Sequence, residues 1–138
     1  MNAANHVFAE RVAAVERHLA RVAERLPADA SSLKPMTDAS DAIILHLWQA
    51  VQIVIDQALS TCVRTGLGSP SSYAEAFRRL ATAGYLEANL AERLARAAGF
   101  RNVVAHAYDS LDLQRVHEAA TRGPACLRAC LAALAGHQ

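Results

Sequence analysis

The chain has 138 residues and a formal net charge of +1; 53% of its residues are hydrophobic and only 5% are aromatic. This length suits one domain with a core, and we expect residues 1–138 to form a single helical domain. Alanine, leucine, arginine and glutamate are abundant, which favours helices over sheets. The near-neutral charge excludes a generic nucleic-acid coat protein. An RNA substrate would therefore have to be held by a local group of arginines.

Cysteine content and apolar runs bear on the cellular compartment. The three cysteines are odd in number and irregularly spaced, which argues against a disulfide framework. The N-terminus lacks the basic-then-apolar layout of a signal peptide. No apolar run approaches the length of a membrane span, since the run over residues 42–55 is broken by His46, Gln49 and Gln52. We therefore expect a cytoplasmic protein without a membrane partner.

Hydrophobic periodicity predicts an all-α fold, an antiparallel bundle of four to five helices with short loops. The second predicted helix is apolar on more than one side, so it is either central in the bundle or shared with a partner chain. Ser72 and Glu75 have the spacing of a capping box. The predicted helices cover about residues 5–26, 37–64, 72–84 and 87–106, and a fifth region after Asp112 that residues 121–124 interrupt.

The segment from Arg101 to Tyr108 holds residue types that can cleave RNA without a metal. The RNA 2′-hydroxyl attacks the adjacent phosphorus if a base removes its proton and an acid protonates the leaving oxygen. Histidine titrates near neutrality and serves in either role, so His106 is a candidate catalytic residue. Arg101 supplies a permanent, forked donor for the charge on the phosphate oxygens. Asn102 could bond a phosphate or orient the histidine.

The spacing of Arg101 and His106 constrains how they act together. On an ideal helix they are about 140° apart in net rotation and about 7.5 Å apart in rise, so they do not reach one small group from a straight helix. Either the helix bends or ends near His106, or a second copy of the chain completes the site across a two-fold axis. Arg101 and Tyr108 fall within about 20° of one face if the helix continues.

Three other features are weighed as parts of a site. Asp56 lies in a polar stripe of the second helix and is a candidate supporting residue, with a solvated or interface position as the alternative. Trp48 is expected in the core or a dimer interface rather than as a platform for a base. Cys126 and Cys130 lack a close pair of further ligands, so we expect no metal site and no cofactor.

Residues 99–108, followed by Leu111 and Asp112, resemble the signature of the HepT-like toxins of the HEPN superfamily. That signature is an arginine, four to six residues, a histidine, any residue and a tyrosine, with a polar residue directly after the arginine. Residues 48–56 and 66–77 are also similar to that family. The arginine–histidine spacing alone would recur by chance, whereas the full octamer in a helical protein of this size is more specific.

The resemblance implies a helical homodimer whose two motifs face a common cleft. It implies a metal-independent endoribonuclease of the Arg-x4-His type, acting as the toxin of a bacterial toxin–antitoxin pair. The implied partners are an RNA substrate and a cognate minimal nucleotidyltransferase antitoxin (MntA-like), in the homodimer or in a larger assembly. This antitoxin would inactivate the toxin by transferring AMP to the motif tyrosine, here Tyr108. Adenylates would add negative charge and bulk to an anion-binding cleft and so block RNA.

Two other kinds of function stay open from the sequence. The same cleft could bind a nucleotide or the nucleotidyltransferase without cutting RNA, as an antitoxin or regulatory subunit. Alternatively, the chain could be a plain interaction bundle. The completeness of the motif argues against the plain bundle, but it does not separate the enzyme from the binding module.

Overall fold

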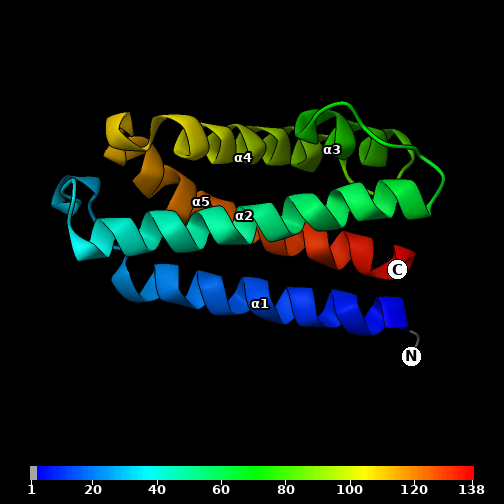
Figure 1. Cartoon of the computed structure of the whole chain (residues 1–138), viewed down its shortest axis with the longest axis horizontal. Coiled ribbons are helices and arrows are strands. Elements are labelled where there is room, and N and C mark those ends of the chain that lie inside the picture. The colour runs from blue at the N-terminus through cyan, green and yellow to red at the C-terminus, as the bar shows by residue number, and fades with distance from the viewer. Residues whose placement is uncertain (1–2) are drawn as a thin grey trace.

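A computed structural model describes residues 3–138 of the chain as a bundle of five α-helices, without a strand among these residues (Figure 1). The all-α expectation is therefore confirmed. Buried residues from all five helices form one core cluster. The helices are α1 (Ala3–Arg25), α2 (Asp38–Arg64), α3 (Tyr73–Thr82), α4 (Ala88–Ala107) and α5 (Leu113–Leu134), with short 3-10 turns η1 (Ala30–Ser32), η2 (Tyr108–Ser110) and η3 (Ala135–His137).

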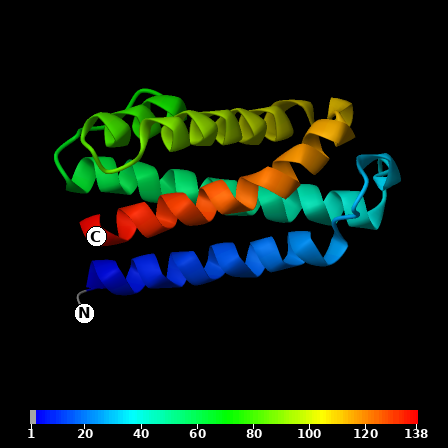
Figure 2. The same cartoon turned by 180° about the vertical axis from the view of Figure 1, so that it is seen from behind.

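Helix α2 is the centre of the bundle and contacts each of the other four helices. Figure 1 shows α1 on one side of it and α3 and α4 on the other, and Figure 2 shows α5 crossing the opposite face. The helix begins after Thr37, whose side chain accepts a hydrogen bond from the Ser40 backbone N–H at 3.3 Å. It ends at Arg64. These bounds and the central position agree with the sequence-based prediction.

The apolar character of α2 corrects the expectation that no apolar run approaches the length of a membrane span. Among residues 3–138 it is the one helix that is long and apolar enough to cross a membrane, judged by length and composition alone. Half of its apolar window is buried inside the bundle. A helix that packs against four others needs apolar residues on several faces. The place of α2 in the core therefore accounts for its composition.

Helix α1 buries one apolar stripe against the bundle, made of Phe8, Val15, Leu19 and Val22. The predicted interruption of the last helix is wrong, because α5 runs unbroken with Pro124 inside it. A proline within a helix costs about 3 kcal/mol through a lost hydrogen bond and a steric clash. Packing offsets this cost, because α5 buries residues on both sides of the proline. These are Val116, Ala120, Leu127, Cys130, Leu131 and Leu134.

Helix α3 packs against α4, and local signals mark both of its ends. The Ser72 side chain caps α3 by accepting from the Glu75 N–H at 3.1 Å, as predicted. The Glu75 carboxylate, however, accepts from the Ser71 N–H at 2.6 Å, so the reciprocal bond of the capping box is displaced by one residue. Gly84 follows α3 with a φ of 85°, a left-handed conformation that favours glycine at the end of a helix. The chain then turns back into α4.

Candidate active site

The motif lies where α4 ends. Arg101 and His106 are both inside the helix, which stops at Ala107, and Tyr108 begins the turn η2. Because the helix continues past His106, Arg101 and His106 keep the separation of an ideal helix, about 140° in net rotation. His106 is exposed, and no hydrogen bond within residues 3–138 joins it to Arg101. Within one chain the two candidate catalytic groups are therefore not brought together.

Arg101 is half-buried and held by groups from two other helices, α2 and α3. Its Nε donates to Oε1 of Gln52 in α2 at 2.6 Å. Its guanidinium carbon lies 5.6 Å from the ring centre of Trp48 and 5.6 Å from that of Tyr73, the first residue of α3. Both distances suit a cation–π contact. The fold thus fixes the orientation of the guanidinium, which lies over the Trp48 ring.

A short hydrogen-bond relay connects Arg101 to Asp56. Gln52 accepts from Arg101 through its oxygen and donates from Nε2 to Asp56 Oδ1 at 2.9 Å. Within the described residues, Asp56 is therefore linked to the arginine through Gln52. The sequence pattern indicates Asp56, but not Gln52, as a supporting residue. Their i,i+4 spacing on one helix is the signal that could have identified the pair.

Asn102 and Val103 occupy the exposed side of α4. Asn102 accepts a hydrogen bond from Nη1 of Arg101 at 3.3 Å, so within one chain it contacts the arginine and not the histidine. Val103 is 50% exposed, whereas the neighbouring Val104 is buried. Successive residues on a helix are about 100° apart, and here the packing of α4 buries Val104 and leaves Val103 outside.

Tyr108 is anchored to the start of α2. Its hydroxyl donates to Asp41 Oδ1 at 2.7 Å. This hydrogen bond, together with partial burial and the nearby negative charge, raises the pKa of Tyr108 to about 12. Asp41 lies 67 positions away in the sequence, and no local pattern pointed to it. The helix does not continue to Tyr108, so the shared face predicted for Arg101 and Tyr108 does not form.

A hollow of about 420 Å³ separates α2 from the end of α4 next to the motif. Two of its lining residues, Leu45 and Tyr108, are exposed to 51% and 44%. The Nε1 atom of Trp48 is buried and lacks a hydrogen-bond partner in the described part of the chain. The remaining lining residues are Asp41, Ile44, Val104 and Ala105. The hollow is therefore mainly apolar, with the Tyr108–Asp41 pair as its polar part.

The described residues offer no alternative centred on a metal. No three His, Cys, Asp or Glu side chains within residues 3–138 lie close enough together to hold an ion. Cys130 is buried in the core, and burial raises the pKa of its thiol to about 12. Cys126 instead contacts Nη1 of Arg93 through its sulfur at 3.8 Å. The chemistry available at the end of α4 is that of an imidazole, a fixed guanidinium and a phenol.

Comparisons with known proteins place the chain in one family. The mRNA nuclease HepT of Shewanella oneidensis is 28% identical over 112 residues, 81% of this chain and 84% of that protein. Two solved structures share the fold. The tri-AMPylated Shewanella oneidensis HEPN toxin in complex with MNT antitoxin has a TM-score of 0.83 and 24% identity, over 97% of this chain and 98% of that one. A toxin–antitoxin complex with AMP-PNP has a TM-score of 0.84 and 22% identity, over 94% of this chain and 97% of that one. The model of the family described as ribonuclease HepT-like matches residues 11–134, so the chain belongs to the HepT-like ribonuclease family.

Proposed function

We propose that this chain is a metal-independent endoribonuclease that acts in the cytoplasm as the toxin of a bacterial toxin–antitoxin pair. One observation carries the proposal: a complete motif lies at the end of α4, with Arg101 anchored and His106 exposed to a ligand. Family membership and the likeness to an mRNA nuclease support RNA as the substrate. Arg101 and His106 are the proposed catalytic residues, with Asn102 and Asp56 in support.

The RNA's own 2′-hydroxyl is the nucleophile in this reaction. His106 removes the hydroxyl proton, the oxygen attacks the adjacent phosphorus, and the bond from phosphorus to the next nucleotide's 5′ oxygen breaks. The leaving oxygen takes up a proton, and the upstream fragment keeps a 2′,3′-cyclic phosphate. Arg101 donates to the phosphate oxygens, whose negative charge grows in the transition state. Asn102, which contacts Arg101, is placed to donate to the same phosphate.

The proposed active form is a two-fold homodimer. General base and general acid are two roles, and each chain offers one His106, which does not meet its own Arg101. A two-fold axis duplicates both residues in one cleft. Leu45 of α2, which lines the hollow, and Val103 of α4 are both exposed large apolar side chains, which supports a second copy at this place.

Growth and RNA analysis test the function. Expression of the wild type in bacteria should arrest growth and yield RNA fragments with cyclic phosphate ends. His106→Ala should abolish both effects, because the base is lost while an exposed side chain contributes little to folding. The matched control is His6→Ala, which removes an exposed histidine of α1 far from the motif in the sequence. It should behave as the wild type. If wild type and His106→Ala are equally harmless, the chain is a binding module and not the toxin.

Mixing two inactive chains tests the composite site. Arg101→Ala and His106→Ala should each be inactive alone. In a mixed dimer, the intact Arg101 of one chain meets the intact His106 of the other, so mixing should restore a small part of the activity, while the second histidine stays missing. A site built within one chain would stay broken in every dimer, and no activity would return. A solution mass near that of one chain would also contradict the dimer.

We further propose that a minimal nucleotidyltransferase antitoxin (MntA-like) inactivates the toxin at Tyr108. The phenol oxygen attacks the α-phosphorus of ATP, a new oxygen–phosphorus bond forms, and pyrophosphate leaves. With a pKa of about 12, the phenol is protonated at neutral pH, and Asp41 lies in position to accept its proton during the attack. Intact mass after co-expression should increase by whole AMP units in the wild type. An increase that persists in Tyr108→Phe would contradict this assignment.

A further inference from the structure

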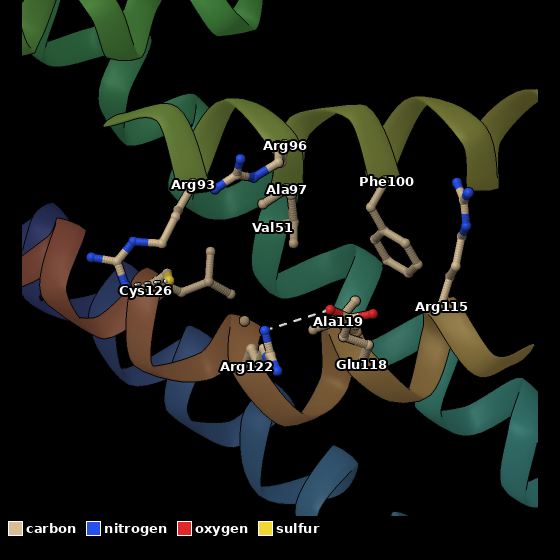
Figure 3. Close-up of a pocket in the computed structure, with 13 residues that line it drawn as sticks. Val51, Arg93, Arg96, Ala97, Phe100, Arg115, Glu118, Ala119, Arg122 and Cys126 are labelled. Carbon is tan, nitrogen blue, oxygen red and sulfur yellow. Dashed lines mark hydrogen bonds and ion pairs between the residues drawn. The ribbon is translucent and has the colours of Figure 1, made fainter. Parts of the chain in front are cut away.

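A second cleft lies on another flank of α4, between α4 and α5 (Figure 3). It has a volume of about 590 Å³, and its floor includes Leu47 and Val51 of α2. Neither His106 nor Tyr108 lines it. Its walls carry four arginines, Arg93 and Arg96 from α4 and Arg115 and Arg122 from α5. We call this cleft the arginine groove.

The arginine groove carries more positive charge than its own carboxylates balance. Glu118 is its one acidic lining residue, and it pairs with Arg122 at 3.6 Å. Within residues 3–138, no carboxylate lies within 4.0 Å of the Arg93 or Arg96 guanidinium. By contrast, Arg78 and Arg128 elsewhere are paired closely with Glu92 and Glu16, and Arg115 of the groove lies 3.9 Å from Asp112. The groove therefore holds guanidinium groups that are available to an anion.

The groove also offers an apolar surface beside these charges. In Figure 3 the Phe100 ring points from α4 toward α5, and Arg115 stands next to it. A forked guanidinium binds phosphate oxygens, and an aromatic ring stacks on a nucleobase of any sequence. An acidic peptide would use the charges but would leave the ring without a matching group. The combination therefore favours a nucleotide chain over an acidic protein segment.

The position of the groove connects it to the motif. Phe100 directly precedes Arg101, and both belong to α4. From Arg93 to His106 the helix rises by roughly 20 Å, so a strand held in the groove can extend along α4 to the catalytic end. We propose that the arginine groove binds the RNA strand beside the cleaved bond, through its phosphates and one stacked base. This inference rests on the proposed ribonuclease function.

Binding of a fluorescent single-stranded RNA tests this proposal. His106→Ala serves as the background, so that the RNA stays intact during the measurement. Adding Arg93→Gln and Arg96→Gln should raise the Kd by about tenfold or more, because two charge-assisted contacts to phosphate are lost. The slope of log Kd against log salt concentration should fall by about 1.4, since each phosphate contact on a single strand contributes about 0.7. Arg115→Gln with Arg122→Gln should act in the same direction from the other wall.

The matched control is Arg11→Gln with Arg17→Gln, which removes the same charge from exposed positions on α1. It should leave the Kd within about twofold of the background. Equal RNA binding by the groove and control variants would overturn the proposal. Intact RNA binding with loss of the antitoxin complex would also overturn it, because the groove would then dock a protein. If wild type neither binds nor cleaves RNA, the proposed function itself fails, and this result is distinct from the other two.

Discussion

The two halves of α4 differ sharply although they form one continuous helix. Over residues 88–98, the side chains Leu90, Ala91, Leu94 and Ala98 are buried, and Glu92 forms two hydrogen bonds with Arg78 of α3. Over residues 99–107, Val104 is the one buried residue. Here Asn102, Val103 and His106 face solvent. The first half is fixed by packing against α3 and α2, whereas the last turns of the second half, after Arg101, extend past α3 (Figure 1).

This difference separates two roles along α4: the first half contributes to stability, and the second half carries the residues proposed to act on RNA. A buried side chain contributes through the apolar area that it removes from water. An exposed polar group is hydrated already, so leaving it without a protein partner costs little. The second half of α4 can therefore keep His106 free for a ligand without loss of stability. Arg101 is the exception, because its use needs a fixed orientation and the fold provides three contacts for it.

Truncating one side chain in each half of α4 gives the largest expected contrast. Leu94→Ala should lower the free energy of unfolding by about 2–5 kcal/mol, because Leu94 is only 1% exposed and its removal leaves a cavity. At protein concentrations low enough to keep the chain monomeric, Val103→Ala should lower it by less than about 0.5 kcal/mol. Urea denaturation measures both values. A comparable loss for Val103, growing with protein concentration, would mean that a second copy packs against the end of α4.

Removing the partner of Tyr108 should shift its ionisation. The Asp41 carboxylate favours the protonated phenol, so Asp41→Asn should lower the Tyr108 pKa from about 12 toward about 10. A raised pKa adds stability below pH 10 that is lost as the pH rises through 12, and this part should disappear in the variant. Ultraviolet absorbance of tyrosinate, corrected with Tyr108→Phe, measures the shift. An unchanged titration would mean that the hydrogen bond does not persist in solution.

Removing the hydrogen bond between Arg101 and Gln52 should have the smallest effect of the three changes. Gln52→Ala removes the acceptor of the Arg101 Nε hydrogen bond and should lower kcat for RNA cleavage by about tenfold, the loss expected for one charge-assisted bond. The free energy of unfolding and the KM should change little. Gln49→Ala, three positions earlier on α2, is the control and should cleave at the wild-type rate. Equal rates for both variants would show that Arg101 does not need to be positioned.

Local patterns predicted much of the fold because its helices begin and end on local signals. Thr37 caps α2 and Ser72 caps α3 through bonds to residues three positions ahead, which a sequence displays directly. Pro124 misled the prediction, since its local cost is visible in the sequence while the packing that offsets it is not. Val103 and Val104 were indistinguishable for a related reason, because the packing of α4 decides which valine is buried.

The sequence by itself determined the helical class, the bounds of α2 and the chemical content of the motif, because these depend on periodicity, caps and residue types within a few positions. Only the tertiary structure decided how the motif residues are held. The Arg101–Gln52 bond spans 49 positions and the Tyr108–Asp41 bond spans 67. Such contacts arise when α4 and η2 pack on α2, and the arginine groove likewise requires α4 and α5 to lie side by side. Packing of distant helices is set by the whole core, and no short segment of the chain encodes it.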